Sequence, residues 1–486
     1  MFGIEFLSPS GLFMALYAVN FIIALTIIFL ERKDPSATLA WILILFMAPA
    51  VGIVLYFLLS QNISRQKIFK LTKHEESVIN HALRDQIAAL RGENFNFINH
   101  VVKKWRDMVF LNQTYARSML TQDNHLSIIT DGQHMLASML EDIKRAKRTI
   151  NVEYYIIKKD GAGLALLEAL TRKAREGVEV RLLIDAMGGR QFAARDMDAF
   201  KAAGGKFAFF FQPKLKFLTM KFNYRNHRKL VTIDGKVGYL GGFNIGNEYL
   251  GKVEKFGYWR DTHLRLQGSS VHNMNARFVM DWRFASKEDI YITETYNPEP
   301  GNVGEAAIQV VASGPDSSRE EVKHGYLKMI SSARKNIYIQ TPYFVPDASI
   351  FESLKTAALS GIDVRLMIPC MPDHMFVYWA TYSYAGMLME AGCKVYIYEN
   401  GFLHAKTMTV DGEVASVGSA NFDNRSFRLN FEANAFIYDP DEAYKLEAIF
   451  AADTAKSREL TRAVYRNRSN IIKFKEGVSR LLSGLL

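Results

Sequence analysis

Two short motifs of the same composition hold the residues best suited to chemistry. Each contains a histidine, a lysine two positions later and an aspartate further on: His227, Lys229 and Asp234 in the first, and His404, Lys406 and Asp411 in the second. Residues two apart on a strand face the same side, so each imidazole is expected to point with its lysine. A single His-x-Lys pair could be an ordinary solvated strand face. Recurrence of the whole unit favours catalysis instead.

The sequence after each histidine predicts a hairpin. Asp234 and Asp411 are each followed by glycine between strand-like residues, a strong turn signal. We therefore assign both aspartates to holding the hairpin and the nearby site geometry, and not to proton transfer. Each motif then runs into a glycine-bearing segment that ends in an asparagine, Asn244 or Asn421.

The chain beyond about residue 120 repeats itself. Residues 148–155 resemble residues 335–342, residues 176–184 match residues 360–368, and residues 203–207 match residues 391–395. Alternating strand patterns in these segments are separated by helical stretches, which is typical of an α/β sheet. The sequence therefore predicts two fused copies of one α/β fold.

The paired motifs resemble the phospholipase D superfamily over nearly all of residues 120–450. Within it the chain is similar to the bacterial cardiolipin synthases, on the strength of softer features at residues 34–41, 259–261, 341–346 and 421–426. This resemblance implies two tandem phospholipase D-like domains, each a mixed β-sheet flanked by helices. We place the first at residues 121–300 and the second at 301–456. Both halves are expected to contribute to one active site at their interface.

The resemblance also implies how the histidines act on a phosphodiester. One imidazole attacks phosphorus to give a covalent phosphohistidine, and the other protonates the leaving alcohol. The superfamily pattern favours His227 as the nucleophile and His404 as the acid and base. The non-bridging oxygens would be held by four side chains: Lys229, Lys406, Asn244 and Asn421.

Each imidazole is expected to need a carboxylate partner that sets its tautomer. Glu432, after His404, occupies the family's usual position for such a residue, and Asp261, after His227, is its first-half counterpart. A surface salt bridge is the alternative role for both. No metal or other cofactor is expected, because the lysines supply positive charge and no acidic cluster has metal-ligand spacing.

Two uncharged apolar stretches begin the chain. Residues 6–30 and 35–64 carry no charge, and each is long enough to cross a bilayer, which takes about 20 residues. They predict a transmembrane helical hairpin over residues 6–64. No basic residue precedes the first stretch, which argues against a signal peptide. Four basic residues follow the second stretch and favour a cytoplasmic catalytic part: Arg65, Lys67, Lys70 and Lys73. The resemblance to bacterial cardiolipin synthases implies a multi-pass protein of the bacterial inner membrane.

The net charge and the segments outside the repeats indicate what the protein binds. The formal net charge of +10 favours nucleic acid or an anionic membrane surface as a partner, and the two apolar stretches favour the membrane and not nucleic acid. Residues 65–120 read as a helical connector. Residues 457–486 form a basic amphipathic segment that could lie on anionic lipid or pack on the catalytic part. The two cysteines, Cys370 and Cys393, indicate neither a disulfide framework nor a zinc site.

The acceptor of the phosphatidyl group decides the reaction. A membrane-tethered enzyme meets phospholipids at high local concentration, so we expect transfer from one phosphatidylglycerol to another, which releases glycerol and forms cardiolipin. Hydrolytic phospholipase D and phosphatidylserine synthase share the first half-reaction and remain alternatives. A phosphodiesterase or nuclease acting on nucleic acid is a more remote one.

Overall fold

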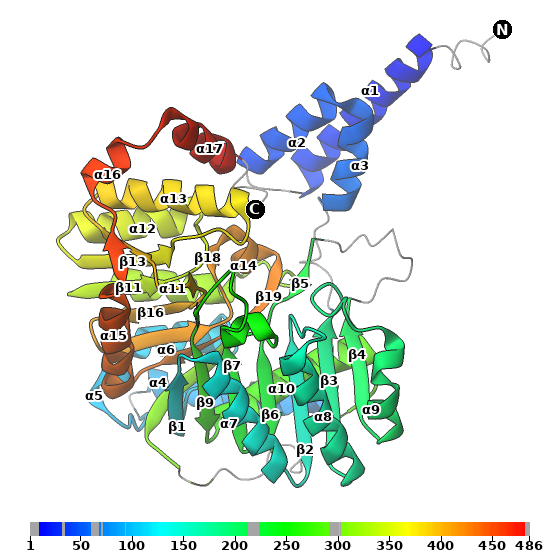
Figure 1. The fold of residues 1–486 in the computed structure, drawn as a ribbon, viewed down its shortest axis with the longest axis vertical. Coiled ribbons are helices and arrows are strands. Elements are labelled where there is room, and N and C mark those ends of the chain that lie inside the picture. Colours follow the sequence, from blue (N-terminus) through cyan, green and yellow to red (C-terminus); the bar gives the residue numbers. More distant parts are fainter. Residues whose placement is uncertain are drawn as a thin grey trace. The chain divides into compact units, whose positions relative to one another are not determined.

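The structure, a computed structural model, describes residues 9–31, 35–59, 68–69, 71–92, 94–211, 223–290, 301 and 303–481 (Figure 1). It separates the chain into two units. One comprises residues 1–63 with residues 213–224, and the other, which we call the catalytic unit, comprises residues 64–212 and 225–486. The two units are described separately.

The N-terminal unit contains one long apolar helix and two shorter ones. Helix α1 (Pro9–Thr26) continues into a π-helical turn, η2 (Ile27–Glu31). Within this helix, Gly11–Phe29 has the length and composition to cross a membrane, and it is the single such segment among the described residues. The stretch expected to form a second continuous span is divided instead into α2 (Pro35–Met47) and α3 (Pro49–Leu59).

Proline explains this division. Pro49 has no N–H to donate to the carbonyl of Leu45, and a proline disfavours helical geometry at the residue before it. The side chain of Asn20 on α1 supplies the missing donor, because its Nδ2 lies 2.7 Å from the Leu45 carbonyl oxygen. The Leu45 carbonyl at the break between α2 and α3 thus accepts a hydrogen bond from the neighbouring helix.

The catalytic unit contains two repeats with the same strand order. In the first half the order is β1 (Thr121–Ile129), β9 (His263–Gln267), β7 (Val237–Gly241), β6 (Leu230–Ile233), β2 (Thr149–Tyr154), β3 (Glu179–Asp185) and β4 (Lys206–Phe210). In the second it is β10 (Ala306–Ser313), β19 (Asn430–Ile437), β17 (Val414–Gly418), β16 (Thr407–Val410), β11 (Asn336–Gln340), β13 (Asp363–Pro369) and β14 (Lys394–Tyr398). Strand β1 pairs antiparallel with β10, so the two domains share one continuous mixed sheet. The predicted duplication and α/β class are confirmed.

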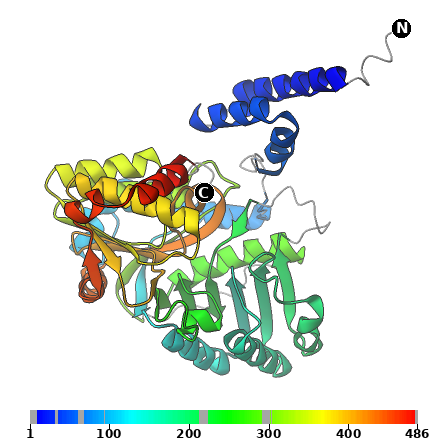
Figure 2. The same ribbon diagram turned by 45° about the horizontal axis from the view of Figure 1, so that its top comes forward.

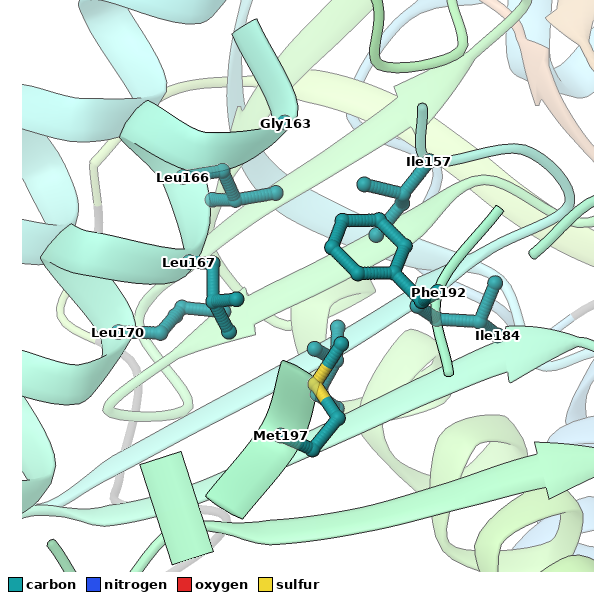
Figure 3. Close-up of a pocket in the computed structure, with 9 residues that line it drawn as sticks. Ile157, Gly163, Leu166, Leu167, Leu170, Ile184, Phe192 and Met197 are labelled. Atoms are coloured by element: carbon teal, nitrogen blue, oxygen red, sulfur yellow. The ribbon is translucent and has the colours of Figure 1, made fainter. Parts of the chain in front are cut away.

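Helices cover the faces of this sheet (Figures 1 and 2). The first half contributes α7 (Gly132–Arg145), α8 (Gly161–Arg175), α9 (Asp198–Ala202) and α10 (Ser270–Ser286). The second contributes α11 (Glu321–Ser332), α12 (Ala348–Leu359), α13 (Met375–Glu390) and α15 (Pro440–Thr454). Figure 3 shows how α8 meets the sheet: Leu166 and Leu170 face Ile184, Phe192 and Met197. These side chains leave no space for water, so this seam is hydrophobic core and not a ligand site.

The segments on either side of the repeats belong to the second half. The connector forms α4 (Lys73–Arg91), α5 (His100–Lys104) and α6 (Arg106–Thr114), whose apolar residues, including Val102 and Met108, are part of that half's core. After α15, strand β20 (Ser457–Glu459) adds an antiparallel edge to β14. It leads into α16 (Arg462–Arg466) and α17 (Asn470–Leu481), and Lys475 of α17 lies over the ring of Trp379 on α13. The C-terminal segment therefore includes a strand as well as an amphipathic helix.

Candidate active site

Two short strand pairs cross between the halves and carry the histidines. Strand β15 (Phe402–Leu403) of the second half runs parallel to β8 (Trp259–Arg260) of the first. In the same way, β5 (Arg225–Asn226) of the first half runs parallel to the start of β19 in the second. The backbone N–H of His404 donates to the Arg260 carbonyl at 2.7 Å, and that of His227 donates to the Phe431 carbonyl at 2.9 Å. Each histidine is thus fixed against the opposite half.

This register brings each imidazole beside a carboxylate of the other half. His404 Nδ1 lies 2.6 Å from Asp261 Oδ2, and His227 Nδ1 lies 3.0 Å from Glu432 Oε2. The sequence suggests the opposite association, with Asp261 serving the first-half histidine and Glu432 the second. The parallel pairs correct it, because the residue after β8 comes to lie beside the residue after β15. Strands β5 and β19 place Glu432 beside His227 in the same manner.

The two carboxylates are held by different neighbours. Glu432 accepts from Ser419 Oγ at 2.5 Å and from Asn430 Nδ2 at 3.2 Å. Asp261 accepts from the backbone N–H of Thr262 at 2.7 Å. Gly242 occupies the position in the first repeat that Ser419 occupies in the second, and a Cβ there would come within 2.0 Å of Asp261 Oδ1. Glycine at residue 242 is therefore required by the close approach of the carboxylate.

Burial sets the charge state of these pairs. Burial and the nearby charge of Lys406 lower the pKa of His404 to about 4, and burial also lowers the pKa of His227. Burial raises the pKa of Asp261, but the charges of Lys406 and His404 outweigh it and hold that pKa below its ordinary value. The pKa of Glu432 is likewise lowered by His227 against the effect of burial. Near neutral pH each pair is a neutral imidazole held by an ionised carboxylate. With Nδ1 engaged, Nε2 is the nitrogen available for chemistry.

Both motif lysines are completely buried. Lys229 Nζ donates to the His227 carbonyl at 2.7 Å, and Lys406 Nζ donates to the carbonyl of His404. Burial lowers the pKa of Lys229 to about 7 and that of Lys406 to about 8. The charges of Asp261 and Glu432 act on both lysines and partly offset their positive charge, and neither lysine is among the residues that line the cleft described below.

The motif aspartates lie in the hairpin turns and do not line the cleft described below. Asp234 accepts the backbone N–H groups of residues 147, 148 and 149 at 2.7–2.9 Å. Asp411 does the same for residues 334, 335 and 336 at 2.7–3.1 Å. Each aspartate has a positive φ, as does the glycine after it. They tie each hairpin to the start of the neighbouring strand, β2 or β11.

A cleft of about 660 Å³ lies between the two halves and is lined by both histidines and both asparagines. Asn244 Oδ1 accepts from the backbone N–H of Ile156 at 3.3 Å, and the backbone N–H of Asn421 donates to Ser426 Oγ at 3.1 Å. Asn421 Oδ1 has no hydrogen-bond partner within the described chain. The structure thus brings the side chains of both motif histidines and of both asparagines that follow the motifs to one cavity.

Sequence reasoning missed several residues that line the cleft. The ring of Tyr155 lies 4.9 Å from that of His227, and the ring of Trp259 lies 5.2 Å from that of His404. Arg225 and Arg425 also line the cleft. The sequence contains a signal for both arginines: Arg225 precedes His227 by two positions, and Arg425 lies within the family-like segment 421–426.

Comparisons with known proteins identify the family of this chain. The family model described as "Cardiolipin synthase, PLD-like domain" matches residues 139–278 and 326–454, and one described as "Phospholipase_D-nuclease N-terminal" matches residues 18–61. Cardiolipin synthase of Staphylococcus aureus is 47% identical over 98% of this chain and 97% of its own, and that of Listeria innocua is 49% identical over 98% and 99%.

A solved structure supports the fold. The phosphatidylserine synthase of Haemophilus influenzae superposes with a TM-score of 0.60 at 16% identity, over 78% of this chain and 97% of that one. At this identity the likeness concerns architecture alone. The full-length relatives and the domain match place the chain in the family of cardiolipin synthases with phospholipase D-like domains.

Proposed function

We propose that this phosphatidyltransferase moves a phosphatidyl group from one phosphatidylglycerol to a second, with release of glycerol and formation of cardiolipin. The observation that carries the proposal is the pair of imidazoles, one from each half, that line one cleft with Nδ1 bound to a carboxylate. Two such groups, with two lysines behind them, suit a double displacement at a phosphodiester.

In the first step, Nε2 of His227 attacks phosphorus and the bond to the glycerol oxygen breaks. His404, in its protonated form, gives a proton to that oxygen, and glycerol leaves. Lys229 and Lys406, with Asn244 and Asn421, hold the non-bridging oxygens and their charge. The entering phosphate anion also favours protonation of the buried groups around it, which supplies the imidazolium for this step.

In the second step, a hydroxyl of another phosphatidylglycerol enters where glycerol left. His404 removes its proton while the oxygen attacks phosphorus, and the P–N bond to His227 breaks. The carboxylates of Asp261 and Glu432 act as positioning groups throughout, because they fix the tautomer of each imidazole and stabilise its cation.

An anionic membrane surface is the partner that we propose for the rim of the catalytic unit. Helix α13 begins beside the cleft, and its first residues, Met375 and Phe376, are more than half exposed. Helix α17, which packs on α13, exposes Ile471 and Phe474 between basic residues. Apolar side chains flanked by positive charge suit the headgroup region of an anionic bilayer.

We also propose that both apolar stretches cross the membrane and leave the catalytic unit on the cytoplasmic side. Helices α2 and α3 together contain enough residues for a second crossing, and the basic residues 65, 67, 70 and 73 follow it. Labelling of single cysteines introduced at residues 33 and 64 in intact cells tests this. Residue 33 should react with an impermeant reagent from outside, and residue 64 should not.

The reaction is tested with the full chain in nanodiscs that contain labelled phosphatidylglycerol. Cardiolipin and glycerol in equal amounts are expected. Phosphatidic acid alone would identify a hydrolytic phospholipase D, and a phosphatidyl-serine product on addition of serine would identify the alternative synthase. Release of nucleotides from labelled DNA or RNA would support the nuclease alternative.

The histidine roles are tested by trapping. Rapid acid-free quenching followed by mass spectrometry should locate the phosphatidyl group on His227. A group found on His404 would reverse the assignment of nucleophile and acid.

A further inference from the structure

A cluster of charged side chains lies beside the first motif but outside the cleft. Arg228, the residue between the motif histidine and lysine, is buried and bonds Asp281 of α10 at 2.7 Å. Arg277, one turn earlier on α10, bonds the same aspartate at 2.6 Å. Glu153 on β2 is completely buried next to these three groups. None of the four side chains lines the cleft, so the reaction proposed above does not use them.

Among the described residues, Glu153 has one hydrogen-bond partner, a neutral amide. Its Oε1 accepts from Asn226 Nδ2 at 2.5 Å, whereas its Oε2 has no partner there. The guanidinium of Arg228 donates to Asp281 and to two backbone carbonyls, and that of Arg277 donates to both oxygens of Asp281. An ionised carboxylate is costly to bury without an ion pair or several donors. The surroundings of Glu153 therefore favour its uncharged form.

The second repeat has a glutamine at the equivalent position. Glu153 on β2 pairs with Leu230, and Gln340 on β11 pairs with Thr407. Leu230 and Thr407 are each the third residue after a motif histidine. Gln340 therefore occupies the place of Glu153, with a side chain of the same shape and no charge.

The surroundings of Gln340 resemble those of Glu153. Gln340 Nε2 donates to Asp453 at 2.8 Å, and Asp453 also accepts from Arg260 Nε at 2.8 Å. Asp453 lies on α15, which follows the last strand of the second repeat as α10 follows that of the first. Each half thus has a buried Arg–Asp pair beside this position. In the second half the side chain next to the pair is neutral.

The charges around Glu153 act in both directions. Burial raises the pKa of Glu153 well above its ordinary value, and the charge of Asp281 adds to this effect. Three groups lower the pKa without reversing the direction: Arg228, Arg277 and Asn226. On the same face of the neighbouring strand β3, Asp185 accepts a backbone N–H of β5, and Arg181 bonds Glu179.

We infer that Glu153 is a neutral carboxylic acid in the folded protein and acts as a positioning residue for the first motif. It holds Asn226, the residue before His227, and Asn226 pairs with Phe431 of the other half. The carbonyl of Phe431 also accepts the His227 N–H at 2.9 Å. Loss of the proton from Glu153 would place an unpaired charge behind this junction. The protonation state of Glu153 does not depend on which acceptor lipid the enzyme uses.

The first test is the pH dependence of stability. The pKa of Glu153 is higher in the folded chain than its ordinary value of 4.5, so the folded state binds the proton more tightly. Wild-type stability therefore falls as pH rises from about 4.5 through the folded pKa. Glu153→Gln lacks this group, so its Tm relative to wild type should rise by about 2 °C or more between pH 5 and 8.

Two further variants serve as controls. Gln340→Glu places an acid beside Asp453 in the second half, so its Tm relative to wild type should fall as pH rises. Glu352→Gln removes an exposed carboxylate that pairs with Lys355, so its Tm difference from wild type should stay constant with pH. A Tm of Glu153→Gln that falls relative to wild type with rising pH would show that Glu153 is ionised and would overturn the inference.

Activity and infrared spectra of the full chain complete the test. Glu153→Ala removes the acceptor of Asn226 Nδ2, so kcat for cardiolipin formation should fall about tenfold, and Glu153→Gln should recover most of it. In a detergent without carbonyl groups, wild type should show a carboxylic acid C=O band that is missing from Glu153→Gln. Loss of a carboxylate band in its place, or no recovery by glutamine, would contradict the neutral acid. A wild-type chain that forms no cardiolipin would refute the proposed function and leave the Tm and infrared outcomes unaffected.

Discussion

His404 Nδ1 lies 2.6 Å from Oδ2 of Asp261, a residue 143 positions earlier in the chain and in the other half of the catalytic unit. The reciprocal pair joins His227 to Glu432. Each half therefore supplies a histidine to the site and the carboxylate that positions the other half's histidine. Neither half contains a complete pair, so both domains are needed to form the site.

The histidine and the carboxylate of each crossed pair should be energetically coupled. A double-mutant cycle on thermal or denaturant stability should give a coupling of about 0.5 to 3 kcal/mol for His227 with Glu432 and for His404 with Asp261. For the exchanged combinations, His227 with Asp261 and His404 with Glu432, the losses of stability should add within about 0.5 kcal/mol. Coupling of His404 to Glu432 in place of Asp261 would contradict the geometry.

Removing either carboxylate charge should slow catalysis. Asp261→Asn and Glu432→Gln keep the shape of the side chain but no longer favour the imidazolium form, so kcat should fall about a hundredfold or more. Steady-state cardiolipin formation measures this, with Glu413→Gln as a control because Glu413 pairs with Lys104 away from the cleft. A loss below tenfold would show that the carboxylates do not assist the histidines.

Position 242 should not tolerate serine, the residue found at the equivalent position 419 of the second half. Gly242→Ser makes the first half resemble the second at this position, but its Cβ would meet Asp261 Oδ1 at 2.0 Å and displace it from His404. We expect at least a hundredfold loss of kcat, comparable with that of Asp261→Asn. Ser419→Gly, the reverse exchange, removes a donor to Glu432 and the acceptor of the Ala433 N–H but introduces no clash, and should cost about tenfold. Equal effects of the two exchanges would refute this account.

Anion binding should depend on pH through the buried lysines. A phosphodiester binds the protonated lysines, whose free pKa values are about 7 for Lys229 and about 8 for Lys406. Lys229 is fully protonated only below about pH 6, and Lys406 loses its proton as pH rises through 8, so affinity should be highest near pH 6 and fall across this window. Calorimetry with glycerophosphoglycerol in buffers of different ionisation enthalpy should also detect proton uptake. Affinity that is constant between pH 6 and 9 would contradict the lowered pKa values.

The motif aspartates should act on stability more than on chemistry. Asp234→Ala removes the acceptor of three backbone N–H groups, and the same holds for Asp411. The free energy of unfolding should fall by about 1 to 3 kcal/mol. The folded fraction, measured at reduced temperature, should still form the phosphohistidine. Failure of fully folded protein to form it would place these aspartates in the reaction.

Asn20 should stabilise the N-terminal unit. Asn20→Leu leaves the Leu45 carbonyl without its donor in an apolar setting, so the contact between α1 and α2 should weaken. Protease resistance of the unit in nanodiscs should decrease, whereas Thr26→Val should have little effect because the Thr26 hydroxyl donates to the Ile22 carbonyl within α1. Unchanged resistance in Asn20→Leu would show that the Pro49 break needs no external donor.

The sequence by itself predicts most of what is local or repeated. The spacing of the two motifs, the Asp-Gly turns and the matched strand segments predict a duplicated α/β fold, because strand periodicity and turn chemistry are properties of neighbouring residues. The uncharged stretch around Gly11–Phe29 predicts an apolar helix for the same reason. The division of the next stretch at Pro49 could also have been predicted from the sequence, since proline is a recognised helix breaker.

Only the tertiary structure decided which carboxylate serves which histidine. Asp261 and Glu432 can be identified along the chain, but their partners depend on parallel pairing between β8 and β15 and between β5 and β19, where strands more than 140 residues apart meet. Arg225 and Arg425 reach the cleft in the same way, one from each half. Periodicity carries no information about such long-range register, because the pairing is set by how the two repeats pack against one another.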